Sequence, residues 1–127
     1  MLISTPVSLG ELIDKISILQ IKKKNISDKN KLILISEELE FLEETLSNEI
    51  KDTTINQFLD KMIKINSELW KIEDDIRDCE RNKNFDQKFI DLARSVYFTN
   101  DKRSQIKLDI NKLFGSKIVE VKSYEKY

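Results

Sequence analysis

The clearest pattern in the sequence is a series of apolar residues that recur at alternating spacings of three and four between residues 55 and 79. The series consists of Ile55, Phe58, Met62, Ile65, Leu69, Ile72, Ile76 and Cys79. This spacing places the side chains on one face of an α-helix, as in a helix that packs along another helix in a coiled coil. The pattern therefore predicts one long helix that organises the fold.

Helical patterns also precede this segment. Ser8 is a favourable N-cap and Glu11 completes the sequence of a capping box, so a helix is expected from here to about Asn25. Its apolar stripe is wide, which predicts that it packs against two neighbours rather than one. Ser27 or Asp28 is expected to cap a second helix that ends near residue 50.

The pattern changes again after the long helix. Residues 82–85 break the apolar spacing, and Asp86 is expected to cap a fourth helix. Thr99 and Asn100 predict an interruption before a fifth helix, which is expected to stop at Gly115, because glycine commonly follows a helix C-terminus.

Together these elements predict an all-α fold with a single domain over residues 1–127. The connection at residues 52–54 is short, so the second and third helices are expected to be antiparallel neighbours that form a long helical hairpin. The N-terminal helix and the last two helices are expected to pack around this hairpin as a bundle. Residues 118–121 predict either a short strand or a short extended C-terminal arm.

Composition agrees with a helical protein and excludes several function classes. Charged residues make up 35% of the chain and hydrophobic residues 39%, with only 2 Gly and 1 Pro. The net charge of −1 gives no reason to expect nucleic-acid binding. No apolar segment is long enough to predict a membrane span, and the N-terminus lacks the pattern of a signal peptide.

The chain offers few residues for catalysis. Histidine is absent, and no phosphate-binding loop, dinucleotide fingerprint or cysteine-metal spacing occurs. We therefore assign no catalytic residue, metal or cofactor, and favour a protein that is not an enzyme. The single cysteine, Cys79, fits a core position better than a reactive thiol, and a cytoplasmic location is expected.

One polar segment is a candidate anion-binding or ligand-binding site. An arginine pair beside a helix N-terminus suits a carboxylate or a phosphate, because two-pronged hydrogen bonds act together with exposed N–H groups. The alternative is that these polar residues only cap a helix and pair with nearby carboxylates. The candidate residues are Arg94, Asn100, Asp101, Lys102 and Arg103, together with Lys15 and Glu11 of the first helix.

The long hairpin is also expected to leave apolar surface uncovered, which predicts a homodimer or another protein partner. Trp70 flanks the apolar series and is expected to pack against either the first helix or a second copy of the chain. The candidate interface residues are Trp70, Phe58, Met62, Ile65 and Leu69.

Several segments together resemble a known family. They are Ser8 to Ile16, Glu68 to Arg77, Leu92 to Arg103, Ile110 to Ser116 and Val121 to Tyr124. In this order they resemble a family of short bacterial proteins classified as a domain of unknown function, DUF family 6165, over nearly the whole chain. The resemblance implies no established activity, but it implies that these motif-dense segments matter to the family's role. It also associates the chain loosely with sugar-transfer and cell-surface polysaccharide pathways.

These observations favour a non-enzymatic helical module for interaction or assembly. The alternative is a small helical enzyme, or a binder of an anionic small molecule, that uses a site lined by arginine and lysine. The two hypotheses differ in whether Arg94 and Arg103 point into a shared pocket or out to solvent.

Overall fold

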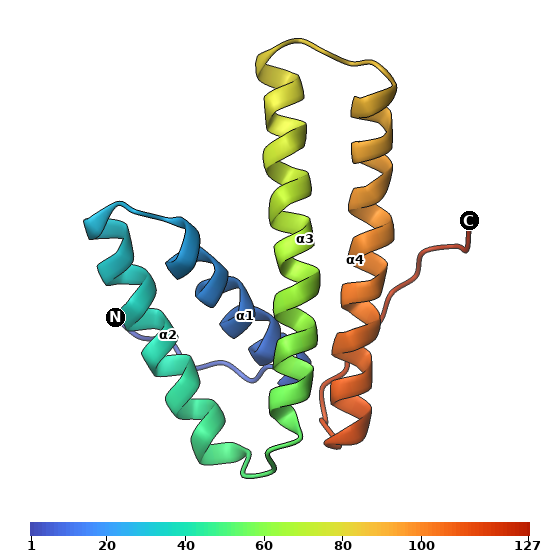
Figure 1. The fold of residues 1–127 in the computed structure, drawn as a ribbon. Coiled ribbons are helices and arrows are strands. Elements are labelled where there is room, and N and C mark those ends of the chain that lie inside the picture. Colours follow the sequence, from blue (N-terminus) through green and yellow to red (C-terminus); the bar gives the residue numbers. More distant parts are fainter.

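The computed structural model describes residues 1–127 and confirms the all-α fold. It contains four helices: α1 (Leu9–Asn25), α2 (Lys29–Glu49), α3 (Ile55–Arg81) and α4 (Gln87–Leu113) (Figure 1). The bounds of the first three helices and the start of α4 agree closely with the predicted ones. None of the four helices is both long and apolar enough to cross a membrane.

The predicted N-caps explain where three of the helices begin. The side chain of Ser8 accepts a hydrogen bond from the Glu11 backbone N–H at 3.1 Å, and Asp28 accepts one from Lys31 at 3.0 Å. Asp86 accepts one from Lys88 at 3.1 Å at the start of α4. Each cap satisfies one of the backbone donors that a helix N-terminus leaves free.

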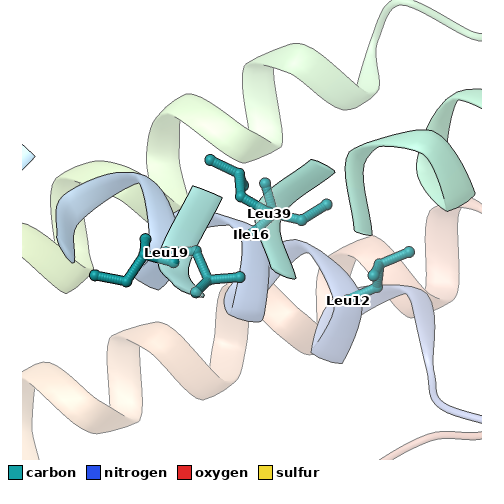
Figure 2. Packing of buried hydrophobic residues seen from close by; sticks show 5 residues of the cluster. Leu12, Ile16, Leu19 and Leu39 are labelled. Carbon is teal, nitrogen blue, oxygen red and sulfur yellow. The ribbon is translucent and has the colours of Figure 1, made fainter. Parts of the chain in front are cut away.

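The central element of the fold is α1. One of its faces packs on α2 and the other packs on α3 and α4, so the wide apolar stripe has the two sets of neighbours that the sequence predicted. Figure 2 shows Leu12, Ile16 and Leu19 of α1 beside Leu39 of α2. On an adjacent face, Ile13 joins a second cluster with four residues of the other helices: Ile55, Met62, Ile65 and Ile110.

The predicted pairing of the second and third helices is wrong. The long antiparallel hairpin is formed by α3 and α4, while the backbones of α2 and α3 do not come into contact and α1 lies between them (Figure 1). A short connection makes two helices follow each other closely in space, but it does not oblige them to pack side by side. Here the apolar face of α2 packs mainly on α1 instead of on α3.

The predicted interruption at Thr99 and Asn100 is also wrong, because α4 continues through both residues to Leu113. Thr99 is buried, and the Asn100 side chain accepts a hydrogen bond from Arg103 one turn later. No Gly or Pro occurs between residues 86 and 113, so nothing forces the backbone hydrogen bonds to break.

Both long helices end in the same left-handed turn. Gly115 has φ of 67° after α4, and the Ser116 N–H donates to the Asn111 carbonyl at 2.8 Å, as in a Schellman motif. After α3 the corresponding residue is Lys83 with φ of 52°, and Asn84 donates to the Cys79 carbonyl at 2.9 Å. A lysine therefore occupies a conformation that suits glycine.

Residues 116–127 form an extended arm rather than a strand, and the arm runs along α4 (Figure 1). Its last residue, Tyr127, donates a hydrogen bond from its hydroxyl to Asp101. The Tyr127 ring packs against Tyr97 and Phe98, with ring centroids 5.3 and 4.9 Å apart. The hydrogen bond to Asp101 raises the pKa of Tyr127 to about 12.

Candidate functional site

A group of polar side chains lies inside the bundle where α1 crosses the α3–α4 hairpin. Five polar residues from three helices are buried there: Asp14, Ser17, Asn66, Lys107 and Asn111. Buried polar groups are costly unless hydrogen bonds or ion pairs satisfy them, so their arrangement decides whether they stabilise the fold or form a site.

Asp14 is the centre of this group. Its Oδ1 accepts a hydrogen bond from Asn66 Nδ2 at 2.8 Å, and the same amide donates to Ser17 Oγ at 2.7 Å. Its Oδ2 lies 3.8 Å from Arg103 Nη1 and 3.9 Å from Lys107 Nζ. A single buried carboxylate thus faces two cations of α4, neither of which it contacts as closely as a direct hydrogen bond requires.

Lys107 has closer partners than Asp14. Its Nζ lies 2.7 Å from a Glu11 carboxylate oxygen and 2.9 Å from one of Glu120 in the C-terminal arm. Burial lowers the pKa of Lys107, but hydrogen bonds to these two carboxylates and the charges of Glu11 and Asp14 raise it more, so the net pKa lies above the usual 10.5. Hydrogen bonds from Lys122 and from Lys107 lower the pKa of Glu120 to about 2.

Gly10 sets how closely α1 approaches α4. Its N–H donates to Asn111 Oδ1 at 2.7 Å, and a Cβ atom at this position would lie 2.6 Å from the Lys107 carbonyl oxygen. Only glycine permits this contact between two helix backbones. The contact in turn brings Asp14 and Glu11 within reach of Lys107.

A cavity of about 560 Å³ opens between α1, α3 and α4 beside this polar group. Asn66, Asn100 and Arg103 contribute polar groups to its lining, and Trp70 contributes a half-buried aromatic ring. Arg103 Nη2 donates to Asn100 Oδ1 at 2.7 Å, whereas Arg103 Nε is buried and has no hydrogen-bond partner.

The structure separates the predicted ligand-binding residues into two sets. Arg103 and Asn100 line the cavity, and Glu11 belongs to the polar group through Lys107. The others lie elsewhere: Lys15 and Lys102 are exposed outside this cavity, Asp101 faces the arm beside a second cavity of about 660 Å³, and Arg94 lies over the Phe98 ring at 5.9 Å.

The predicted arginine pair beside a helix N-terminus is therefore wrong. Arg94 and Arg103 are nine residues apart on one continuous helix, and at about 100° per residue this places them on opposite faces. No helix begins between them, so no free backbone N–H groups are available for an anion there.

The candidate interface residues lie in three different environments: the cavity lining, the buried core and a half-buried position. Trp70 and Leu69 line the cavity, and Trp70 packs near α1, one of the two options that the sequence left open. Met62 and Ile65 are buried in the core of one chain, so they have almost no surface left for a partner. Phe58 is half-buried and contacts Phe114 edge to face at 6.2 Å between ring centroids.

Sequence reasoning missed most of the buried polar residues. Asp14 and Ser17 fall between the apolar residues of α1, and Lys107 and Asn111 follow the predicted Arg103 at intervals of four residues along α4. The signal available was that the wide stripe of α1 enclosed polar positions.

No group of three or more Cys, Asp and Glu side chains is placed to hold a metal ion. The arrangement suits binding of a polar group, because its amide and guanidinium atoms face a space large enough for a small molecule.

The comparisons with known proteins identify the chain's family. The model of a family of unknown function, DUF6165, matches residues 3–127, and the chain therefore belongs to this family. The comparison with curated proteins found no match, and neither did the comparison with solved structures.

Proposed function

We propose that this member of the DUF6165 family is a non-enzymatic helical module that assembles as a homodimer through the free part of its α3–α4 hairpin. The supporting observation is the incomplete burial of the apolar seam between these two helices. The C-terminal end of α3 and the N-terminal end of α4, which the loop at residues 82–86 joins, extend past α1 and α2 (Figure 1).

In this free part, the seam is half-buried instead of buried. Only Cys79 is buried, whereas the other seam residues remain partly exposed: Ile72, Ile76, Phe89, Leu92 and Val96. Where α1 covers the hairpin, by contrast, Met62 and Ile110 have no exposed surface. Phe85 and Ile90 add exposed apolar surface near the tip, with 50% and 46% of their area accessible. Two helices alone leave one side of their seam open, and another pair of helices would close it as a four-helix bundle.

The charges of the hairpin favour a second copy as the partner. Residues 68–80 of α3 carry six carboxylates and two cations, whereas residues 87–103 of α4 carry four cations and two carboxylates. In a twofold dimer the same surface meets itself, so α3 of each chain can lie beside α4 of the other. Each acidic helix then faces a basic one, which favours this pairing over other registers.

Light scattering coupled to size exclusion tests this proposal. At about 50 µM the full chain is expected at twice its mass of 15.0 kDa. Ala93→Glu is expected to give the monomer. Ala93 is exposed and lies one turn from Phe89 on α4, so a carboxylate there leaves the single chain undisturbed but faces the acidic α3 of the partner.

Ile33→Glu provides the matched control, because it also introduces a carboxylate at an exposed position, but on α2, outside the hairpin. This variant is expected to remain dimeric. A wild-type monomer at 50 µM, or dissociation by Ile33→Glu with Ala93→Glu unaffected, would contradict the proposed dimer.

A cytoplasmic and bacterial setting is part of the proposal, as is the link to sugar-transfer or polysaccharide pathways. The lone, buried Cys79 agrees with a reducing compartment, since it has no partner for a disulfide within the chain. Co-purification from the native host, with Ala93→Glu as the comparison, tests the link: enzymes of these pathways are expected with the wild type, and their absence would contradict it.

A further inference from the structure

The cavity beside Trp70 has the features of a small-molecule site that self-association does not explain. Its volume of about 560 Å³ falls within the range of roughly 300–1,000 Å³ that is usual for ligand pockets. Apolar side chains of α1, α3 and α4 account for five of its eleven lining residues. The polar residues are Asn66, Asn100 and Arg103, together with the exposed charged residues Glu73, Asp74 and Arg77. An apolar wall with a few convergent polar groups is typical of a site for an organic ligand.

Two buried side-chain nitrogens have no hydrogen-bond partner, Nδ2 of Asn111 and Nε of Arg103, and of these two residues only Arg103 lines the cavity. The guanidinium carries five N–H donors, yet its hydrogen bond within the chain is the one to Asn100, and the buried Nε has no partner. The carboxylate closest to it, Asp14, lies 3.8 Å away and already accepts a hydrogen bond from Asn66. The Arg103 side chain as a whole is 28% exposed, but Nε itself is buried, and a buried N–H normally has an acceptor. Nε therefore lacks an acceptor that a ligand can provide.

We propose that this cavity binds an organic monocarboxylate with an apolar body, with Arg103 as the partner of the carboxylate and Trp70 as part of the apolar wall. The planar guanidinium matches a carboxylate through two parallel hydrogen bonds. At the rim, Glu73 and Asp74 lie beside Arg77, so the lining carries as many negative as positive charges. This balance disfavours a phosphate dianion, and the apolar wall disfavours a small inorganic anion.

Trp70 makes the binding directly measurable, because it is the only tryptophan in the chain. We would titrate acetate, isovalerate and cyclohexanecarboxylate to 20 mM at pH 7 and follow the side-chain N–H signals of Trp70 and Arg103 by NMR. Saturable shifts of both signals are expected, with affinity rising with the size of the apolar body. Cyclohexanecarboxamide, which has the same body without the charge, is expected to bind at least tenfold more weakly.

Matched arginine variants assign the effect to the cavity. Arg103→Met is expected to weaken cyclohexanecarboxylate binding at least tenfold, as read from the Trp70 signal, whereas Arg94→Met on the opposite face of α4 should leave it unchanged. Arg103→Lys keeps the charge but loses the planar pair of donors, so at least fivefold weaker binding is expected. This variant provides the test if Arg103→Met does not fold.

Four results would overturn the proposal: no saturable shift with any of the three carboxylates, equal binding of the carboxamide, unchanged binding by Arg103→Lys, or tighter binding of inorganic phosphate. Ala93 does not line the cavity, so Ala93→Glu is expected to bind the carboxylate as the wild type does. Because Val96 belongs both to the cavity lining and to the apolar seam of the proposed dimer, the monomeric Ala93→Glu variant tests the ligand site in the absence of the dimer.

Discussion

The contact at Gly10 gives the sharpest prediction about stability. Gly10→Ala adds a Cβ atom 2.6 Å from the Lys107 carbonyl oxygen and 3.0 Å from the Lys107 Cα. Both atoms belong to the backbone of α4, so no side-chain rotation relieves the overlap and the helices must separate. Overpacking of this kind costs about 1–3 kcal/mol. Weakening the buried 2.7 Å hydrogen bond from Gly10 to Asn111 adds about 1 kcal/mol.

The higher helix propensity of alanine offsets up to about 1 kcal/mol, so the net loss in the free energy of unfolding is about 1–4 kcal/mol. With a urea m-value of about 2 kcal/mol/M, the midpoint falls by roughly 0.5–2 M. Urea unfolding followed by circular dichroism at one fixed protein concentration measures this shift.

Asn111→Ala separates the two causes of the loss. In that background the side-chain hydrogen bond is already gone, so Gly10→Ala should retain most of its cost if the contact with the α4 backbone is the reason. Stability of Gly10→Ala within 0.5 kcal/mol of the wild type would show that α1 and α4 are not held this closely.

Three further predictions concern other parts of the chain. Lys83→Gly relieves the left-handed conformation after α3 and should stabilise the fold by about 0.5 kcal/mol in thermal unfolding, whereas Lys88→Gly, within α4, should destabilise it by about 1 kcal/mol. Asp14→Ala removes the buried carboxylate between Arg103 and the buried Lys107 and should cost about 3 kcal/mol, against less than 0.5 kcal/mol for Lys15→Ala. Similar values for the two variants would refute the role of Asp14. The pKa of Glu120 is about 2 in the docked arm and ordinarily 4.5, so its contribution to docking is complete above pH 4.5 and is lost as the pH falls to 2. The amide NMR shifts of the arm should change over this pH range. Glu120→Gln should abolish the transition.

Much of the helical framework could be predicted from local signals. Ser8, Asp28 and Asp86 cap helices as expected, and Gly115 ends α4 in the left-handed turn that the sequence suggested. These features depend on residues within one turn of each other, so the sequence around each is enough to read them. The break at Asn100 was misread because its side chain bonds to Arg103 instead of competing with the helix backbone.

The candidate site was only partly predictable. Arg103 and Asn100 were found as polar residues suited to an anion, but Arg94 was grouped with Arg103 because a helix break was expected between them. On the continuous α4 the two arginines face opposite ways. Asp14, Asn66 and Lys107 were missed because a charged or amide side chain on a helix usually faces solvent, and no local signal distinguishes one that does not.

The sequence by itself determined that this chain is all-α, where three of its helices lie and that α1 needs neighbours on two faces, because caps and the 3.6-residue period act within a single helix. Only the tertiary structure decided that α3 pairs with α4, that α1 lies between α2 and the hairpin, and that the buried polar residues meet beside Trp70. Those outcomes depend on which apolar faces fit one another and on the absence of a side chain at Gly10, where two helix backbones touch.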